Sequence, residues 1–167
     1  MRKIHVFSKP FCDDIIEKLN ENVRFILQYE DDSIDNNENL KVIQHQPTDA
    51  DGWYPDNNSE YMLSIMDVLK SNIENIEETV TVIQRLDTKK KSKPHKDSYD
   101  FTTVLLLNEN FKGGDLIIEN EKSNLKIGEL VVFDSHEMHY VDKLTEGERY
   151  TLITFVNIKK KKEKSLI

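Results

Sequence analysis

The hydrophobic pattern divides the chain into a helical first part and a strand-rich second part. Apolar residues recur at three- and four-residue intervals in two segments, which predicts two amphipathic helices. The first segment follows Ser8 and Pro10, both typical helix-start residues, and contains Phe11, Ile15, Leu19, Val23, Ile26 and Leu27. The second contains Tyr61, Met62, Ile65, Met66, Leu69 and Ile73. From residue 78 onward the apolar residues alternate with polar ones, which is the period of a β-strand.

This second part predicts several short strands separated by turns. We expect strands at 80–86, 102–107, 115–119, 125–127, 130–133 and 149–157, preceded by short ones at 3–7 and 40–45. Glycines at Gly113, Gly114 and Gly147 mark turns between them. Two helices followed by many short strands predict a mostly β, α+β fold, in which the helices pack on one side of an antiparallel sandwich or barrel. We predict one domain at 1–158, with helical support at 1–77, the β-barrel core at 78–158, and a Lys-rich, disordered tail at 159–167.

Composition and charge narrow the functional classes. The net charge of −8 argues against a nucleic-acid partner, because binding phosphates requires a positive surface. The single cysteine, Cys12, excludes a disulfide framework and a multi-cysteine metal site. No apolar run approaches the roughly 20 residues of a membrane span, and polar residues interrupt the start too early for a signal peptide. We therefore expect a soluble, cytoplasmic protein with no membrane contact. The sequence does not indicate its oligomeric state.

Polar segments at 29–38, 46–58 and 87–93 are predicted loops and candidates for the rim of a substrate site. The loop at 46–58 contains Trp53 and Tyr54, which either pack into the core or contact a substrate, and packing is the favoured interpretation. Lysines crowd the third loop and continue to Lys96. Such a run is usually a solvated surface, but this one adjoins a histidine with metal-binding potential.

That histidine, His95, is followed by Asp97 in a His-x-Asp pattern. Residues two apart on a strand share a face, so both side chains can reach one metal ion. Two histidines and one carboxylate form the facial triad of non-haem Fe(II) oxygenases. The third ligand must come from elsewhere in the sequence, and the candidates are His136 and His139. Because these are three apart, only one can point inward along an extended segment.

Arg149 and Thr151 are also two apart in a predicted strand and share a face with apolar residues. A buried, unpaired guanidinium is costly, and a carboxylate arriving from solvent would pair with it in two-pronged geometry. The Thr151 hydroxyl can donate to the same carboxylate. The alternative is an exposed Arg149 that pairs with Glu146 or Glu148.

Taken together, the segments at 93–97, 101–108, 111–116, 128–133 and 139–152 resemble the prolyl 4-hydroxylase-like branch of the Fe(II)/2-oxoglutarate-dependent oxygenases. The resemblance covers residues 78–157, about half of the chain, and selects His139 over His136. It implies a double-stranded β-helix, a jelly-roll or cupin-like barrel, with Fe(II) held by His95, Asp97 and His139. It also implies 2-oxoglutarate bound at Arg149 and Thr151, O2 as co-substrate, and ascorbate as a further candidate cofactor.

The activity implied is that of a dioxygenase that hydroxylates an unactivated C–H bond while converting 2-oxoglutarate to succinate and CO2. Asp97 favours hydroxylation, because related halogenases lack this carboxylate. The family often has a tyrosine where this chain has Ser92 and an aromatic residue where it has Leu106, and such tyrosines commonly assist 2-oxoglutarate. The substrate is expected to be a peptidyl proline or, alternatively, a free amino acid or other small metabolite. A non-catalytic β-barrel binding domain is the remaining alternative.

Overall fold

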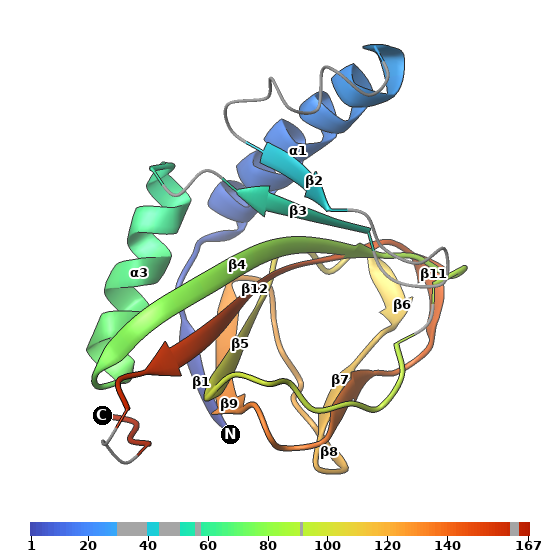
Figure 1. Ribbon diagram of the computed structural model, residues 1–167. Helices are drawn as coiled ribbons and strands as arrows, with labels where there is room; N and C mark the ends of the chain where they lie inside the picture. Colours follow the sequence, from blue (N-terminus) through green and yellow to red (C-terminus); the bar gives the residue numbers. More distant parts are fainter. Residues whose placement is uncertain (30–39, 44–50, 56–57, 91, 161–163) are drawn as a thin grey trace.

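The computed structural model describes residues 1–29, 40–43, 51–55, 58–90, 92–160 and 164–167 (Figure 1). The described part is mostly β with two helices, as the sequence predicts. In chain order the elements are β1 (Arg2–His5), α1 (Lys9–Tyr29), β2 (Leu40–Ile43), β3 (Asp51–Pro55), α3 (Glu60–Asn72), β4 (Ile76–Leu86), β5 (Phe101–Leu106), β6 (Phe111–Gly113), β7 (Leu116–Ile118), β8 (Glu121–Lys122), β9 (Glu129–Asp134), β10 (His139–Val141), β11 (Leu144–Gly147) and β12 (Arg149–Ile158).

The strands form one large and two small antiparallel sheets. The large sheet has the order β1-β9-β5-β12-β4-β3-β2, and the small ones have the orders β10-β7-β8 and β11-β6. Strand β1 pairs with β9 through registers such as Arg2 with Val132, so the start of the chain closes one edge of the large sheet. Residues 1–77 thus supply three strands of the large sheet in addition to both described helices.

The central strands of the large sheet are buried on both faces, and alternate residues enter two different hydrophobic clusters. On β5, Leu105 belongs to one cluster and Val104 to the other. On β12, Leu152 and Ile153 divide in the same way. The first cluster also holds α1 and α3 residues, including Cys12, Ile15, Leu19, Met62, Ile65 and Leu69. The second contains Leu116 and Ile118 of β7, which places the small sheet against the opposite face.

Both predicted helices are present, and the buried stripe of each follows the predicted spacing. Helix α3 buries Met62, Ile65 and Leu69 while Leu63 stays exposed. In α1 the same holds for Ile15 and Leu19. The side chains of Val23, Ile26 and Leu27 lie outside the described residues. None of the described helices is both long enough and apolar enough to cross a membrane.

The prediction of a loop at 46–58 is wrong for its central residues. Residues 51–55 form strand β3, which pairs with β2 and with β4, where Trp53 lies opposite Ile83. Trp53 is 4% exposed, whereas Tyr54 is 40% exposed. Alternation on a strand thus explains why the first packs into the core and the second does not. Residues 46–50 and 56–57 of this loop lie outside the described residues. So do residues 30–38 of the predicted loop at 29–38, while Tyr29 is the last residue of α1.

Two other expectations also need correction. Residues 125–127 are not a strand. The tail, expected to be disordered, has described positions at its end, where Leu166 forms a bridge with Ile73. Nearby, the Lys164 ammonium lies 2.8 Å from a carboxylate oxygen of Asp134.

Candidate metal centre

Three side chains with metal-binding potential meet where the β4–β5 connection crosses β10. His95 and Asp97 lie in that connection rather than in a strand, contrary to the predicted alternation. His95 pairs with His139 through both backbone hydrogen bonds, of 3.0 and 2.9 Å, in an isolated antiparallel bridge. The backbone N–H of Asp97 donates to the Ser135 carbonyl at 2.8 Å. These main-chain contacts, rather than a continuous strand, bring the two side chains to the same place.

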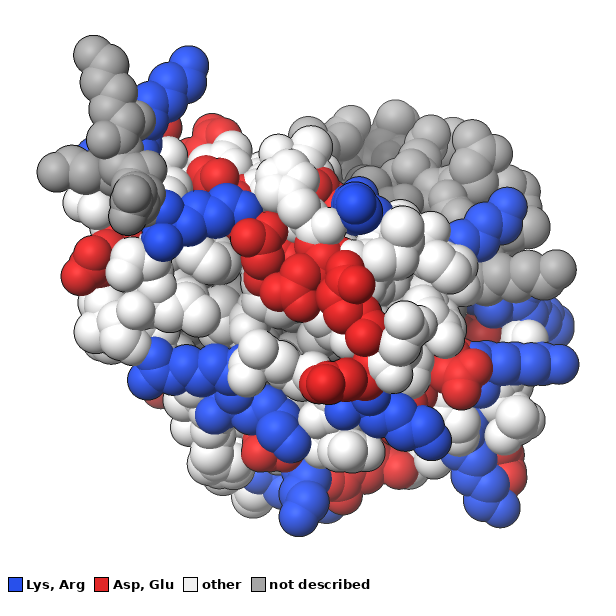
Figure 2. Space-filling view, turned by 90° about the horizontal axis from the view of Figure 1, so that it is seen from below, with Lys and Arg blue, Asp and Glu red and all other residues white. Residues whose placement is uncertain are grey.

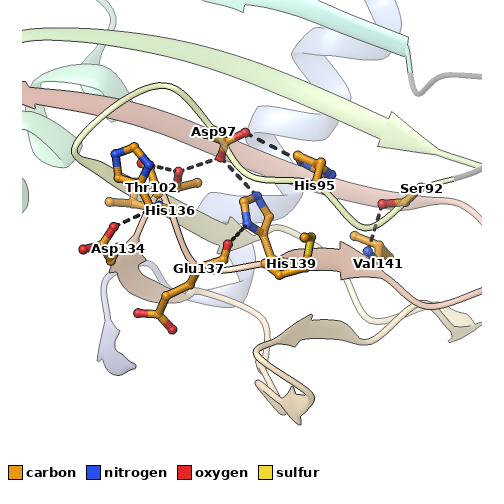
Figure 3. Close-up of polar contacts among 12 residues, drawn as sticks. Ser92, His95, Asp97, Thr102, Asp134, His136, Glu137, His139 and Val141 are labelled. Carbon is orange, nitrogen blue, oxygen red and sulfur yellow. Dashed lines mark hydrogen bonds and ion pairs between the residues drawn. The ribbon is translucent and has the colours of Figure 1, made fainter.

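The potential ligand atoms of His95, Asp97 and His139 all lie within 4.8 Å of one another. Among the described residues this is the one such group of three or more. His139 Nε2 lies 3.0 Å from Asp97 Oδ2, and His95 Nε2 lies 3.6 Å from Asp97 Oδ1. Figure 3 shows the two imidazoles approaching the carboxylate from the loop and from β10. His139 is buried and Asp97 nearly so, while half of the His95 side chain is exposed, so the group opens to solvent on the His95 side.

Both imidazoles are oriented by backbone carbonyls. His95 Nδ1 lies 2.6 Å from the Lys93 carbonyl, and His139 Nδ1 lies 2.8 Å from the Glu137 carbonyl. A carbonyl only accepts, so each Nδ1 carries the proton and each Nε2 is the atom presented toward Asp97. Metal-binding histidines are typically held in this way, with the second ring nitrogen fixed by a carbonyl or carboxylate.

Of the two candidate third ligands, His139 joins the group and His136 does not. The His139 side chain is 6% exposed and packs edge-on against Phe133, with ring centroids 4.8 Å apart. His136 is exposed, and its backbone N–H donates to Asp134 at 2.9 Å. The side chains of His136 and His139 therefore point in different directions, as expected for two residues three apart in an extended segment.

The carboxylate of Asp97 has two further supports that the sequence did not reveal. Burial alone would raise its pKa, but hydrogen bonds from His139 and Thr102 and the charges of both imidazoles lower it. The Thr102 hydroxyl donates to Asp97 Oδ2 at 2.7 Å and lies 2.8 Å from the Ser135 hydroxyl. The sequence offers one weak signal of these supports, namely a threonine at the start of one buried strand and a serine at the end of its neighbour.

The pKa of His139 is raised. Burial acts to lower it, but the hydrogen bond to Asp97, the Glu137 carbonyl and the nearby negative charge outweigh burial. The imidazole and carboxylate therefore share a proton that a metal ion would displace, because a ligand nitrogen must be unprotonated.

Arg149 and Thr151 both lie on β12. Arg149 is 3% exposed and Thr151 is fully buried. Arg149 Nε and Thr151 Oγ1 have no hydrogen-bond partner within the described residues. Burial lowers the pKa of Arg149 to about 10, against a small opposing effect of the Asp115 charge.

The alternative of an exposed Arg149 paired with Glu146 or Glu148 is wrong. Glu146 pairs with Lys112 at 3.0 Å, and Glu148 accepts the Tyr150 hydroxyl at 2.8 Å. Gly114 leaves room for the buried arginine, since a Cβ there would lie 3.2 Å from Arg149 Cδ.

One cavity of about 110 Å³ joins these groups. Its lining includes all three of His95, Asp97 and His139, together with Arg149 and Gln84. Ile153 and Phe155 follow Arg149 on the same face of β12 and also line it, and Thr151 shares that face by alternation. The cavity therefore has a metal-binding end and a cationic end, and a mainly apolar wall between them.

Comparison with known proteins agrees with this arrangement. Residues 80–157 match the 2OG-Fe(II) oxygenase superfamily. The match covers a little under half of the chain. A PKHD-type hydroxylase of Prochlorococcus marinus (strain NATL1A) is 29% identical over 65 residues, a match that covers 36% of this chain and 29% of the relative. The chain thus matches less than a third of the length of this curated relative.

Two solved structures of prolyl hydroxylases share the fold over almost the whole chain. A Pseudomonas putida prolyl-4-hydroxylase is 17% identical, with a TM-score of 0.60, covering 95% of this chain and 92% of the other. The viral collagen prolyl hydroxylase of Paramecium Bursaria Chlorella virus-1, in its 2OG complex, is 16% identical, with a TM-score of 0.62 and coverages of 95% and 96%. The fold of this chain is therefore that of prolyl hydroxylases.

Proposed function

We propose that this protein is an Fe(II)- and 2-oxoglutarate-dependent dioxygenase that hydroxylates an unactivated C–H bond. The observation that carries the proposal is a single cavity with His95, Asp97 and His139 at one end and the buried Arg149 at the other. A metal site alone would fit many proteins. A facial triad beside a buried cation that forms no ion pair among the described residues fits a metal chelated by an anionic co-substrate.

The three residues fit Fe(II) both in their chemical type and in the orientation of their ligand atoms. His95 and His139 would bind through Nε2, which the carbonyl contacts of Nδ1 leave available. Asp97 would supply the carboxylate, held in place by Thr102. When bound, iron and 2-oxoglutarate supply O2 activation, with 2-oxoglutarate converted to succinate and CO2. The protein positions the substrate and keeps water away from the reacting atoms.

The cationic end fits the distal carboxylate of 2-oxoglutarate. Arg149 Nε and Thr151 Oγ1 are buried donors without acceptors among the described residues, and leaving such donors unsatisfied costs about 1–3 kcal/mol each. A carboxylate would accept from both. Its charge would also offset the burial that lowers the pKa of Arg149.

The similar proteins support a peptidyl proline as substrate, because two of them are prolyl hydroxylases by name. A free amino acid or other small metabolite is the alternative. A nucleic acid fits less well. On the face shown in Figure 2, lysines and arginines are interspersed with acidic residues, and acidic atoms gather near its middle instead of a continuous basic surface.

We also propose a domain organisation for the chain. The large sheet and the two small ones would form the double-stranded β-helix, with residues 78–158 as its core. Residues 1–77 would support it with the two helices on one side, and residues 159–167 would form a tail. The cluster that joins α1 and α3 to one face of the large sheet supports this division.

Anaerobic titration tests the proposed function directly. Fe(II) and then 2-oxoglutarate are added to the metal-free protein, and a weak visible charge-transfer band is expected for the chelate. On admission of air the band should fade and succinate should form. The Asp97→Ala variant, a matched sample lacking one proposed ligand, should show neither. A folded wild-type protein that gives no band would contradict the proposal and favour a non-catalytic binding domain.

A further inference from the structure

A second cavity, of about 480 Å³, lies beside the metal-site cavity. The two share Ser92, Tyr140 and Val141 in their linings. The Ser92 hydroxyl accepts the backbone N–H of Val141 at 2.9 Å, which fastens the lysine-rich loop to β10 at this shared wall (Figure 3). A ligand in the second cavity would therefore lie directly next to the metal-site cavity.

The charge of this second cavity is opposite to that of the whole protein. Its lining contains four lysines, Lys89, Lys90, Lys93 and Lys143, and one acidic residue, Asp142. Four positive charges and one negative give a net +3, in a chain whose net charge is −8. Lysines from two separate segments of the chain thus gather around one opening.

Three of these lysines form no ion pair with the described residues. The Lys90 ammonium lies 3.8 Å from Asp51, which also binds Arg85 at 2.9 Å, so its charge is partly offset. Within the described residues, no ion pair involves Lys89, Lys93 or Lys143. All three are exposed at the cavity and available to an anionic ligand.

We propose that this cavity binds acidic residues that flank the hydroxylated residue of a polypeptide substrate. The inference rests on the proposed dioxygenase function and adds the chemical class of its substrate. Leu86, Pro94 and Leu144 give the cavity an apolar component suited to peptide side chains and backbone. Its volume falls within the range of sites that enclose drug-sized ligands, about 300–1,000 Å³, whereas a small metabolite would need only the inner cavity.

Fluorescence anisotropy with labelled ten-residue peptides tests this substrate class without turnover. Each peptide has one central proline, flanked by glutamates, by glutamines or by lysines. The full chain is used metal-free and again with Mn(II) and 2-oxoglutarate. We expect the glutamate peptide to bind about tenfold more tightly than the glutamine peptide, and its affinity to fall with added salt, which screens exposed charges.

Two triple variants locate the effect. Lys89→Glu/Lys93→Glu/Lys143→Glu should abolish the preference for the glutamate peptide. Lys3→Glu/Lys70→Glu/Lys159→Glu changes the net charge equally at exposed positions outside this cavity, and it should keep the preference. The milder variant Lys89→Gln/Lys93→Gln/Lys143→Gln guards against misfolding, with circular dichroism as a check.

Each contrary outcome overturns a definite part of the proposal. Equal binding of the three peptides, or a preference for the lysine peptide, would overturn the acidic class. Equal losses in both glutamate variants would overturn the location. Competition by free glutamate as strong as by the peptide would overturn a polypeptide in favour of a small anion. Succinate formation without any preference for the acidic peptide would overturn the acidic class but leave the dioxygenase proposal intact. A preference for the acidic peptide without the charge-transfer band would overturn the dioxygenase proposal but leave the acidic binding site intact.

Discussion

The hydroxyl of Thr102 stands between Asp97 and Ser135. It lies 2.7 Å from Asp97 Oδ2 and 2.8 Å from the Ser135 hydroxyl. A hydroxyl has one proton to donate, and the carboxylate can only accept it. Ser135 must therefore donate to Thr102, which donates to Asp97. This chain fixes one oxygen of the proposed metal ligand from the interior of the large sheet.

Replacing Thr102 with valine keeps the shape and removes the donor. We expect the dissociation constant for Fe(II) to rise about tenfold or more, the range seen when groups that orient metal ligands are lost. Anaerobic calorimetry measures it. Thr103→Val is the matched control, because its hydroxyl bonds to the Thr154 carbonyl instead of Asp97. Similar losses in both variants would mean that the effect comes from a general change in β5.

The parts of the site predictable from sequence were those set by local spacing. Alternation placed Arg149 and Thr151 on one buried face, and the structure agrees. For His95 and Asp97 the spacing correctly indicated that the two side chains converge, but the assumed cause, alternation along a strand, was incorrect. Their side chains converge because of main-chain bonds to His139 and Ser135, not because of a regular strand.

The parts that the sequence did not reveal depend on pairing between distant segments. Strand β3 is rich in residues that disfavour strands, and tertiary contacts override that preference. Its Asp51 binds Arg85, whose guanidinium lies 5.2 Å from the centre of the Trp53 ring. Likewise, Thr102 and Ser135 meet only because β5 pairs with β9, where Thr102 lies opposite Phe133.

A pair of nearby histidines offers a direct test of the third ligand. His139→Ala should abolish Fe(II) binding at the site, because it removes the buried imidazole 3.0 Å from Asp97. His136→Ala should leave the affinity unchanged, because that side chain is exposed and outside the group. Both can be measured by the visible band of the 2-oxoglutarate complex. The reverse result would move the site to the other face of the segment.

The end of the chain should contribute to stability in a pH-dependent way. Burial acts to raise the pKa of Asp134, but Lys164 and the His136 N–H outweigh it, so the pKa lies below 3.8. A carboxyl group with a lowered folded-state pKa stabilises the fold above its unfolded-state pKa, and this contribution disappears as the pH falls through the lowered value.

Lys164→Gln should therefore lower the melting temperature slightly at neutral pH, by an effect on the order of 0.5 kcal/mol for a partly exposed pair. The difference between the variant and the wild type should shrink as the pH falls through the lowered pKa of Asp134, because protonation removes the charge that Lys164 binds. Thermal melts over a series of pH values measure this. Lys160→Gln, which changes the same charge at an exposed position nearby, serves as the control. A difference that persists in acid would assign the effect to packing.

The buried Arg149 should make the protein less stable in return for binding its co-substrate. Its pKa falls from 12.5 to about 10, so burying the charged form costs about 3 kcal/mol. Arg149→Met removes that cost while keeping a long side chain. We expect the ligand-free variant to be more stable by about 1–3 kcal/mol, a rise of several degrees in melting temperature for a domain of this size.

The same variant should lose the stabilisation that 2-oxoglutarate gives to the metal-loaded wild type, which grows with ligand concentration above the dissociation constant. Arg149→Lys separates charge from geometry, because an ammonium keeps the charge but cannot form the two-pronged contact. It should retain part of the 2-oxoglutarate effect and none of the added stability. If Arg149→Met instead destabilises the ligand-free protein, the guanidinium has a compensating partner in the fold, and it is not poised for a carboxylate from solvent.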